Sequence, residues 1–366
     1  MDQLKHISII LPSLDPDEKL LTVVDGLLSQ GFSHIVLIND GSKPENLHYF
    51  DTAAQNPQVT LLHHPRTLGK GAALKTGFSW ILGNRPDCLG VVTVDGDNQH
   101  HKEDITACAL QMLKTNHIVL GVRDFSQPDV PPRSRMGNRI TSFVFKAFVG
   151  MTLSDTQTGL RAIPASYLKP MLGIAGDRFE YETNMLLQMK DWSAPYEELK
   201  IRTVYIEENK SSHFRAVRDS VRIYKLIFAR FFRFAASSLA SSVIEEALVI
   251  GLNFGLNRLL SGVSLVAVTT GAARLISSFI NFYLNQRLVF RSNGNTGRAL
   301  ARYFALAIPL ALGQFALTFG IYELFAIPEE SVILRAALYA LVMIVLFFAS
   351  YAIQRRWVFR NQKKED

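Results

Sequence analysis

Asp95 and Asp97, two aspartates separated by a single glycine, are the side chains with the clearest capacity for chemistry in this sequence. They follow an apolar run at 89–94 that is typical of a buried strand. Paired carboxylates can hold a divalent cation, and such a cation offsets the charge that builds up on a leaving phosphate. Gly96 leaves room for the close approach of a ligand. The pattern therefore favours a site for a nucleotide diphosphate over a solvated acidic turn.

Lys70 is a second candidate, because it stands between Gly69 and Gly71 where a predicted helix begins. Backbone amides at the start of a helix and a nearby ammonium group both suit contact with a phosphate. The spacing GxxxxGK followed by Ser or Thr is absent, which excludes a P-loop.

The elements that must position these residues alternate between strands and helices. The predicted strands are 6–11, 34–39, 59–62 and 89–94, and the predicted helices are 18–30, 69–83 and 104–115. This alternation predicts an α/β domain with a mostly parallel, Rossmann-like sheet. Polar clusters at 12–15, 39–42 and 95–99 each follow a predicted strand. Because ligands of parallel sheets bind at the carboxyl ends of strands, we expect the three clusters to share one site.

The length of 366 residues is enough for at least two domains. We expect a soluble domain at 1–225 and an all-α transmembrane domain at 226–366. The predicted membrane helices have bilayer length and cover 234–256, 263–284, 304–321 and 332–353. The mean hydropathy of +0.13 fits such a mixture.

The formal net charge of +7 makes a nucleic-acid partner worth considering. Much of the basic excess lies beside the hydrophobic segments, where it suits anionic lipid headgroups, and no nucleic-acid-binding module is present. Arginines gather between the second and third hydrophobic segments and after the fourth. The positive-inside rule then places the soluble domain in the cytoplasm and the protein in the inner or plasma membrane. The two cysteines form no metal-ligand spacing and no disulfide framework.

The hydrophobic segments contain two features that a simple anchor does not need. Glu245, Glu246 and Arg274 lie near the middle of the first two predicted helices, where charges are costly unless paired, so we predict that Arg274 pairs with one of the glutamates. The segments 285–291 (NQRLVFR) and 354–360 (QRRWVFR) echo each other. They are either two similar interfacial anchors or the ends of two related helical hairpins.

Residues from about 6 to 225 resemble family 2 glycosyltransferases with a GT-A fold, especially dolichol-phosphate mannose synthases and bactoprenol glucosyltransferases. The matching stretches are 9–12 (IILP), 39–42 (NDGS), 69–71 (GKG), 95–99 (DGDNQ), 121–123 (GVR) and 155–161 (DTQTGLR). The membrane half resembles the GtrA-like family of small four-helix membrane proteins. That likeness rests on helix count, topology and the ending of the second helix at 285–290.

The resemblance implies roles for residues at the donor site. The residues expected to line the nucleotide pocket are Pro12, Asp40 and Lys70. Those expected to hold the diphosphate and a Mg or Mn ion are Asp95, Asp97 and Gln99. The segment 211–215 resembles one that folds over donor phosphates in this family, so Ser212 and His213 are further donor-binding candidates. The alternative for that segment is a plain loop beside the membrane.

An acceptor phosphate is already an anion near pH 7 and needs no base, so the enzyme must instead hold two anions together with cations. By resemblance, Arg123 and Arg133 are the best candidates to bind that phosphate, followed by Arg139. The alternative is a solvated basic surface or binding to lipid headgroups. Asp155 could orient an arginine or contact the sugar. Glu182 is favoured over its neighbour Glu180 as the acidic residue near the sugar, and helix N-terminal charge is the alternative.

The resemblance implies a membrane hexosyltransferase that uses a UDP- or GDP-sugar and a polyprenyl phosphate, with inversion, for cell-surface glycan synthesis. Dimers and tetramers both suit related enzymes, so a homo-oligomer is compatible with it. The alternatives are a flippase or presenting scaffold for lipid-linked sugars, and a transferase with a hydroxyl acceptor. The sequence departs from the family pattern at 14–15, where Tyr-Asn is usual, at Asn39, where Asp is usual, and at His100, where Pro is common. The first departure bears on recognition of the nucleobase of the donor, and so on the identity of the donor.

Overall fold

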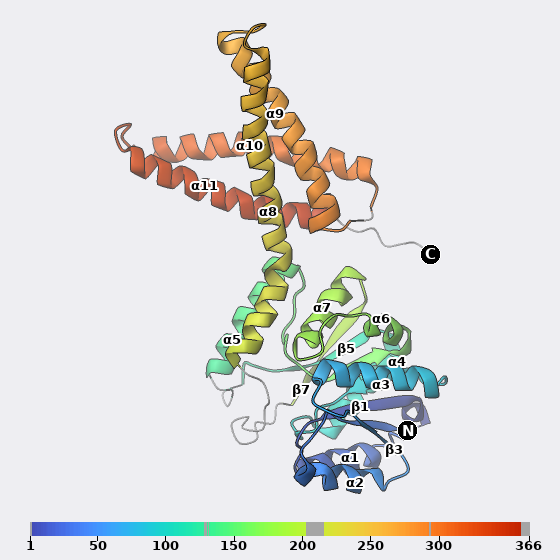
Figure 1. The fold of residues 1–366 in the computed structure, drawn as a ribbon. Coiled ribbons are helices and arrows are strands. Elements are labelled where there is room, and N and C mark those ends of the chain that lie inside the picture. Colours follow the sequence, from blue (N-terminus) through green and yellow to red (C-terminus); the bar gives the residue numbers. More distant parts are fainter. Residues whose placement is uncertain (1, 128–129, 131, 203–215, 293, 360–366) are drawn as a thin grey trace. The chain divides into compact units, whose positions relative to one another are not determined.

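The computed structural model describes residues 2–127, 130, 132–202, 216–292 and 294–359. The chain divides into two compact units, Met1–Leu226 and Ile227–Asp366, and each is described here by itself. Figure 1 shows strands and helices in the first unit and helices in the second.

The first unit is built on a seven-stranded sheet in the order β3-β2-β1-β4-β6-β5-β7. Its strands are β1 Ile7–Ser13, β2 Ile35–Asn39, β3 Val59–His63, β4 Gly90–Thr93, β5 Ile118–Arg123, β6 Arg161–Pro164 and β7 Tyr196–Ile201. Every paired strand is parallel to its neighbours except β6, which is antiparallel to both β4 and β5. The predicted mostly parallel sheet is confirmed, and the first four strands lie where the apolar runs placed them.

The helices of this unit are α1 Lys19–Ser29, α2 Leu47–Ala54, α3 Lys70–Asn84, α4 Lys102–Thr115, α5 Pro132–Val144, α6 Leu168–Leu172 and α7 Glu180–Asp191. Helix α1 shows why they cover the sheet: Leu20 and Leu27 recur on one face and are fully buried in the core beside β1 and β2. Burial of each such leucine contributes about 2 kcal/mol. Strand β5 ends at Arg123, and α5 begins at Pro132.

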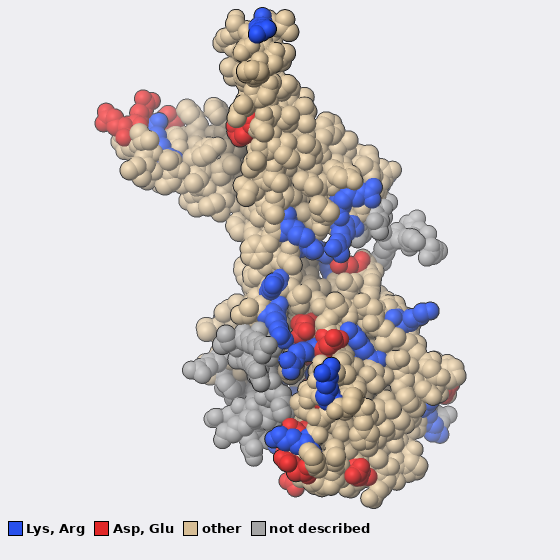
Figure 2. Space-filling view, viewed as in Figure 1, with Lys and Arg blue, Asp and Glu red and all other residues tan. Residues whose placement is uncertain are grey.

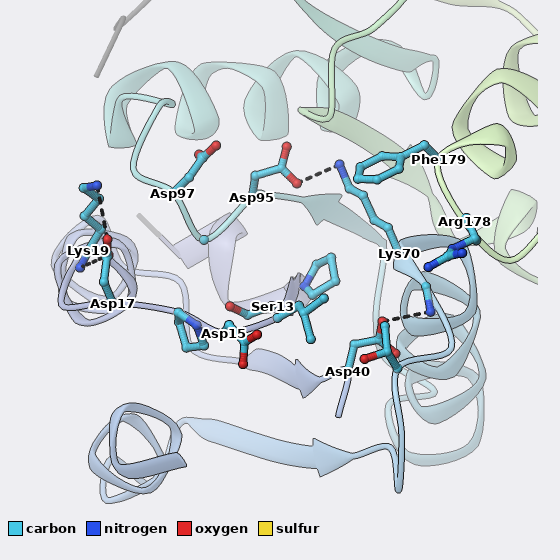
Figure 3. A pocket seen from close by; sticks show the side chains of 16 residues that line it. Ser13, Asp15, Asp17, Lys19, Asp40, Lys70, Asp95, Asp97, Arg178 and Phe179 are labelled. Carbon is cyan, nitrogen blue, oxygen red and sulfur yellow. Dashed lines mark hydrogen bonds and ion pairs between the residues drawn. The ribbon is translucent and has the colours of Figure 1, made fainter. Parts of the chain in front are cut away.

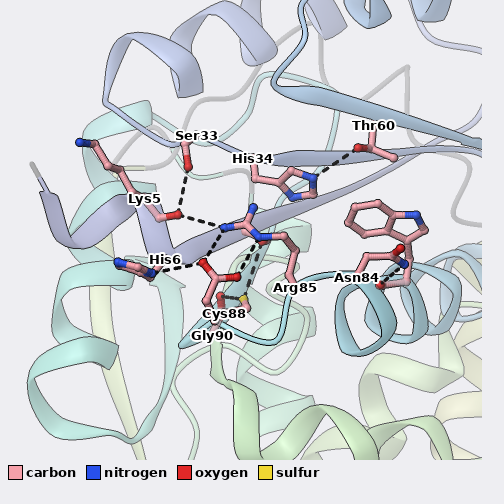
Figure 4. Close-up of polar contacts among 12 residues, drawn as sticks. Lys5, His6, Ser33, His34, Thr60, Asn84, Arg85, Cys88 and Gly90 are labelled. Atoms are coloured by element: carbon pink, nitrogen blue, oxygen red, sulfur yellow. Dashed lines mark hydrogen bonds and ion pairs between the residues drawn. The ribbon is translucent and has the colours of Figure 1, made fainter.

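A polar cluster surrounds His34 at the amino end of β2, away from the carboxyl ends of the strands (Figure 4). The His34 ring stacks on Trp80 with the ring centres 5.0 Å apart, and its Nε2 lies 3.3 Å from Thr60 Oγ1. The Nδ1 atom is buried and has no hydrogen-bond partner among the residues described. Burial, aided by the charge of Arg85, lowers the pKa of His34 to about 4, so the folded protein keeps this ring neutral.

Acidification should therefore cost stability through His34. An unfolded histidine titrates near pH 6.5, so the stability gained from the neutral ring is complete above about pH 6.5 and is lost as pH falls toward 4. We expect the difference in Tm between wild type and His34→Gln to shrink between pH 7 and pH 4.5 in thermal unfolding of the full chain. The matched variant His48→Gln, at an exposed position, should show a constant difference. A constant difference for His34→Gln as well would contradict the prediction.

The second unit consists of helices that are long and apolar enough to cross a membrane. The helices are α8 Ala216–Leu256, α9 Gly262–Leu284, α10 Thr296–Leu324 and α11 Val332–Ile353, and the stretches of suitable length and composition are Val221–Leu256, Gly262–Val289, Thr296–Leu324 and Val332–Val358. Helix α8 begins at Ala216, well before the predicted residue 234. On the face seen in Figure 2 these helices present few charged side chains. Exposed apolar side chains such as Phe254, Phe315 and Ile333 fit contact with lipid.

The predicted ion pair inside this unit is confirmed, and it joins α8 to α9. Arg274 Nη1 lies 2.9 Å from Glu245 Oε2, and the Ser277 hydroxyl donates to the same oxygen at 2.9 Å. Further polar pairs lie along the same two helices, where Asn253 donates to Thr269 and Asn281 donates to Ser241. Pairing lowers the cost of polar groups at membrane depth and fixes the rotation of the two helices.

The two echoing segments at the ends of α9 and α11 adopt the same conformation. Each forms one π-helical turn, Asn285–Val289 and Gln354–Val358. Asn285 Nδ2 donates to Gln354 Oε1 at 3.1 Å, and both residues are buried. The rings of Phe290 and Phe359 stack with their centres 5.1 Å apart. Because the equivalent residues are buried against each other, the structure favours two related hairpins over two independent interfacial anchors.

Candidate active site

A pocket of about 240 Å³ opens at the carboxyl ends of β1, β2 and β4 (Figure 3). It brings together the three polar clusters that follow predicted strands. The lining residues are Pro12, Ser13, Leu14, Asp15, Pro16, Asp17, Lys19, Asp40, Thr67, Gly69, Lys70, Asp95, Gly96, Asp97, Arg178 and Phe179. Five residues singled out from the sequence, namely Pro12, Asp40, Lys70, Asp95 and Asp97, are among them.

Glycines on both sides of Lys70 are required by the backbone. Gly69 has a φ of +114°, a conformation that side chains disfavour. A Cβ on Gly69 would collide with the Asp177 carbonyl, and one on Gly71 would collide with Tyr181. The Ala72 amide donates to the Asp177 carbonyl at 2.9 Å. This close contact between the start of α3 and the loop before α7 fixes the position of the Lys70 backbone, and so the point from which its side chain extends.

Asp40 lines the pocket, but its carboxylate is already engaged. It accepts hydrogen bonds from the backbone amides of Leu68 and Gly69 at 2.9 and 2.8 Å, and its Oδ1 lies 2.7 Å from His64 Nδ1. Asp40 is buried, so these contacts are protected from water. Asp40 therefore shapes the loop that carries Lys70.

The Lys70 ammonium bridges two carboxylates at the centre of the site. Its Nζ lies 2.7 Å from Asp95 Oδ1 and 3.0 Å from Glu182 Oε1. Burial by itself lowers the pKa of Lys70, but the charges of Asp95 and Glu182 outweigh it and raise that pKa above its ordinary value. Burial raises the pKa of Asp95, and the charge of Lys70, helped by His100 and Arg123, outweighs burial and lowers it. The bridge is a stable ion pair at neutral pH.

Asp97 has the opposite electrostatic environment. Burial and the neighbouring charge of Asp95 raise the pKa of Asp97 to about 6. Its Oδ1 accepts a hydrogen bond from the backbone amide of Gln99 at 3.1 Å, so Gln99 lies beside Asp97 in the same loop. Figure 3 shows the carboxylates of Asp95 and Asp97 on the same side of the loop. A carboxylate whose ionisation is disfavoured by burial and by a neighbouring carboxylate fits a divalent cation, which would relieve the repulsion.

The residues described contain no group of three or more His, Cys, Asp and Glu side chains placed to hold a metal ion by themselves. A cation at Asp95 and Asp97 would therefore take its remaining ligands from water or from a bound diphosphate. Magnesium commonly binds in this way, through one or two carboxylates and substrate phosphates.

Arg123 and Asp155 form a second charged pair within the same unit. Arg123 Nε lies 2.7 Å from Asp155 Oδ2 and Nη2 lies 3.1 Å from Oδ1, a two-point contact. The Asp155 side chain is fully buried, and the Gln157 amide also donates to it. Of the two interpretations of Asp155, the geometry supports the one in which it orients an arginine.

Arg161, to which the sequence assigned no role in the site, makes contacts that support the fold. It is fully buried, and it donates to the carbonyls of Thr158 at 3.2 Å and Glu182 at 2.8 Å. It thereby ties the 155–161 motif to the start of α7. Its burial was not readable from the motif, because an arginine in a polar stretch is usually exposed.

The other candidates lie in different surroundings. Arg139 is exposed on α5, and Arg133 lies on the same helix, with its side chain outside the described residues. Ser212 and His213 also lie outside the described residues. The pocket includes Arg178 and Phe179, which sequence analysis missed. Their only signal was adjacency to Glu180, since the packing of their loop on α3 is a tertiary feature.

The departures from the family pattern are accommodated locally. Asp15 has a φ of +48°, which Asn and Asp tolerate better than most residues. Its amide donates to the Ser42 hydroxyl, and its carboxylate accepts from the Lys43 amide. Asn39 accepts from the Ser42 amide at 2.8 Å. Hydrogen bonds within the protein therefore hold this part of the pocket as a turn.

Comparison with known proteins assigns each half. Residues 8–170 match Glycosyl transferase family 2, and residues 252–359 match the GtrA/DPMS transmembrane domain. A UDP-N-acetylglucosamine–dolichyl-phosphate N-acetylglucosaminyltransferase of Methanococcus voltae is 25% identical over 221 residues, which cover 56% of this chain and 87% of the relative. An undecaprenyl-phosphate mannosyltransferase of Micrococcus luteus is 29% identical over 169 residues, which cover 45% and 68%.

Among solved structures, a glucosyl-3-phosphoglycerate synthase of Mycobacterium tuberculosis, in complex with Mn²⁺, UDP and phosphoglyceric acid, superposes with a TM-score of 0.42 at 14% identity. The superposition covers 55% of this chain and 71% of that one. The two family matches and the site geometry agree with the resemblance inferred from the motifs. The chain thus joins a family 2 glycosyltransferase domain to a GtrA/DPMS transmembrane domain, and it is an integral membrane glycosyltransferase.

Proposed function

We propose that this enzyme moves a hexose from a UDP- or GDP-sugar to a polyprenyl phosphate, with inversion at the anomeric carbon. The relatives named above act on dolichyl or undecaprenyl phosphate, which supports a lipid phosphate as acceptor. An enzyme held in the bilayer suits such an acceptor, because the phosphate of a polyprenyl lipid lies at the headgroup plane.

The observation that carries the proposal is the ion pairing of Asp155 and Glu182, the two carboxylates that would be the candidate bases for a hydroxyl acceptor. A hydroxyl acceptor needs a base to remove its proton. Asp155 is bound to Arg123, and Glu182 is bound to Lys70, so neither carboxylate is placed as a ready proton acceptor. A lipid phosphate is already an anion and needs no base. The geometry therefore favours a phosphate acceptor over a hydroxyl acceptor.

Each charged group then has a defined task. Asp40 holds the loop of Lys70, and Lys70 lies where it can contact the donor diphosphate. Arg123, oriented by Asp155, binds the acceptor phosphate and offsets its repulsion from the donor. A Mg or Mn ion bound by Asp95 and Asp97 would offset the charge on the leaving diphosphate. Inversion follows if the acceptor oxygen attacks from the side opposite the leaving group.

The two halves divide the work in this proposal. Residues 1–225 carry out transfer and residues 226–366 hold the enzyme in the membrane, with the catalytic half in the cytoplasm. The exposed arginines Arg287 and Arg291, between α9 and α10, and Arg298, in the first turn of α10, support this orientation through the positive-inside rule. The complete Asp95, Asp97 and Lys70 site argues against a pure flippase or scaffold, although presentation of the product by the membrane half is compatible with catalysis.

A transfer assay tests the proposal. Purified full-length protein is incubated with undecaprenyl phosphate, Mg²⁺ or Mn²⁺, and radiolabelled UDP- and GDP-sugars in turn. We expect one donor to give a product that extracts into organic solvent, and EDTA to abolish it. Omission of the lipid is the control for hydrolysis. Transfer to a hydroxyl-bearing lipid or glycan, with none to the lipid phosphate, would contradict the proposed acceptor.

A further inference from the structure

The Lys70 ammonium neutralises the negative charge of the Asp95 carboxylate. Its Nζ lies 2.7 Å from one oxygen of Asp95, and it reaches the Glu182 carboxylate at 3.0 Å. The side chains of Lys70 and Glu182 are only 16% and 14% exposed, and that of Asp95 is 30% exposed. Ion pairs with so little water around them are much stronger than surface pairs.

The surroundings keep the Asp95 carboxylate against Lys70. Gly159 lies so close that a Cβ there would collide with Asp95 Oδ2 and would lie 3.0 Å from Lys70 Nζ. The Thr93 hydroxyl donates to the Gly159 carbonyl at 2.7 Å, which fixes this segment against the end of β4. The Asp95 side chain therefore has little room to rotate, and it would have to bind a divalent cation while it stays in contact with Lys70.

Asp97 differs from Asp95 in this respect. Among the residues that the structure describes, it has no basic side chain at ion-pair distance, and its hydrogen bond comes from the Gln99 amide. A divalent cation entering the site would find one open carboxylate and one already neutralised. Because the described part of the chain places no third His, Cys, Asp or Glu beside them, these two carboxylates would be the charged ligands that the protein supplies.

We infer that Lys70 is an internal competitor of the divalent cation at Asp95, and that a donor diphosphate removes this competition by drawing the ammonium to its own oxygens. The inference rests on the proposed use of a nucleotide sugar and a divalent ion. Lys70 is then a positioning residue that couples the two ligands, so that the ion binds well only with the nucleotide. Such coupling is reciprocal, because the ion must strengthen nucleotide binding by the same factor.

Release of the bridge would also change Glu182. On donor entry this carboxylate would exchange its contact with Lys70 for hydrogen bonds from the hydroxyl groups of the donor sugar, so it would stay engaged and would not become a free base for an acceptor. The same movement of Lys70 would thus prepare the ion site and the sugar site together. This gives the GKG sequence at 69–71 a role beyond contact with phosphate.

Binding of Mn²⁺ to the purified full-length protein tests the inference without any turnover. Free Mn²⁺ is measured by electron paramagnetic resonance, with and without UDP or GDP, in wild type and Lys70→Met. We expect nucleotide to strengthen Mn²⁺ binding to wild type by roughly 5- to 150-fold, the usual range of such coupling. Lys70→Met should bind Mn²⁺ alone more tightly by a similar factor, and the effect of nucleotide should shrink.

Two further variants serve as matched controls. Lys114→Met removes an exposed lysine from α4 that lies outside the pocket lining, so it should behave as wild type. Lys70→Arg keeps a cation beside Asp95 and should leave Mn²⁺ binding weak without nucleotide.

The outcomes separate this inference from the proposed function. If Lys70→Met binds Mn²⁺ alone no better than wild type, the competition is wrong, while nucleotide-dependent Mn²⁺ binding by wild type would still support a metal-dependent transferase. If wild type binds Mn²⁺ equally well with and without nucleotide, the inference fails without reference to any variant. If wild type fails to bind Mn²⁺ even with nucleotide, both the inference and the proposed metal are wrong.

Discussion

Asp97→Ala should reduce sugar transfer by roughly 1000-fold while the protein stays folded. Groups that stabilise developing charge in an active site are worth roughly 100- to 1000-fold each, and Asp97 is proposed to hold the cation. Asp97 lies in the pocket and forms no ion pair with the residues described, so its removal breaks no salt bridge there and costs the loop the hydrogen bond from the Gln99 amide. Removal of its charge also relieves the repulsion from Asp95, which disfavours ionisation of Asp97 in the native protein.

The measurement compares transfer and Tm of Asp97→Ala with those of Asp51→Ala, a substitution at an exposed aspartate on α2. Asp51→Ala should retain wild-type transfer. Asp97→Asn, which keeps the shape of the side chain, should be nearly as inactive as Asp97→Ala, because the loss comes from the charge. Turnover within tenfold of wild type in both Asp97 variants would refute the role in cation binding.

The position of the site could be predicted because parallel strands end at a shared edge. The clusters at 12–15, 39–42 and 95–99 are far apart in the sequence, but β1, β2 and β4 are neighbours, so their carboxyl ends meet. Nothing beyond strand periodicity and turn chemistry was needed to place them together. The same logic found Lys70, since a glycine-flanked lysine at the start of a helix faces that edge.

The internal partners of the site could not be predicted, because they depend on packing between distant elements. Arg178 reaches the pocket only because the loop before α7 packs on α3, where Gly71 allows contact with Tyr181. The strand β6 is antiparallel between two strands that precede it, and no local pattern signals this topology. The hydrogen bond from the Gly69 amide to Asp40 could not be predicted either, because the motif shows only an aspartate after a strand.

The membrane half shows the same division between what the sequence predicts and what it leaves open. Antiparallel helices of known length bring Arg274 to the depth of the glutamates, so a pair was predictable. The choice between Glu245 and Glu246 depends on helix rotation, because neighbouring residues point about 100° apart. The structure selects Glu245, which shares the α9-facing side of α8 with Ser241 and Asn253, both hydrogen-bonded to α9.

Arg123→Ala should reduce transfer by roughly 100- to 1000-fold, mainly through the acceptor step, because it removes the cation proposed to hold the acceptor phosphate. Arg139→Ala is the matched comparison, since this arginine is exposed on α5, and its loss should change transfer only a few-fold. The rates are measured at varied undecaprenyl phosphate and fixed donor, and then at fixed lipid and varied donor. Equal losses in the two variants would contradict the assignment of the phosphate site to Arg123.

The role of Asp155 follows from a double-mutant cycle with Arg123. Asp155→Asn should lower activity, because Arg123 loses the two-point contact that orients it. It should also lower the free energy of unfolding by up to about 3–5 kcal/mol, because removal of one partner breaks a buried ion pair. If Asp155 acts through Arg123, the double variant should transfer no more slowly than Arg123→Ala alone. A double variant much slower than Arg123→Ala would show that Asp155 contacts the sugar itself. The cycle therefore distinguishes between the two roles proposed for this aspartate, and the buried pair in the structure predicts the first result.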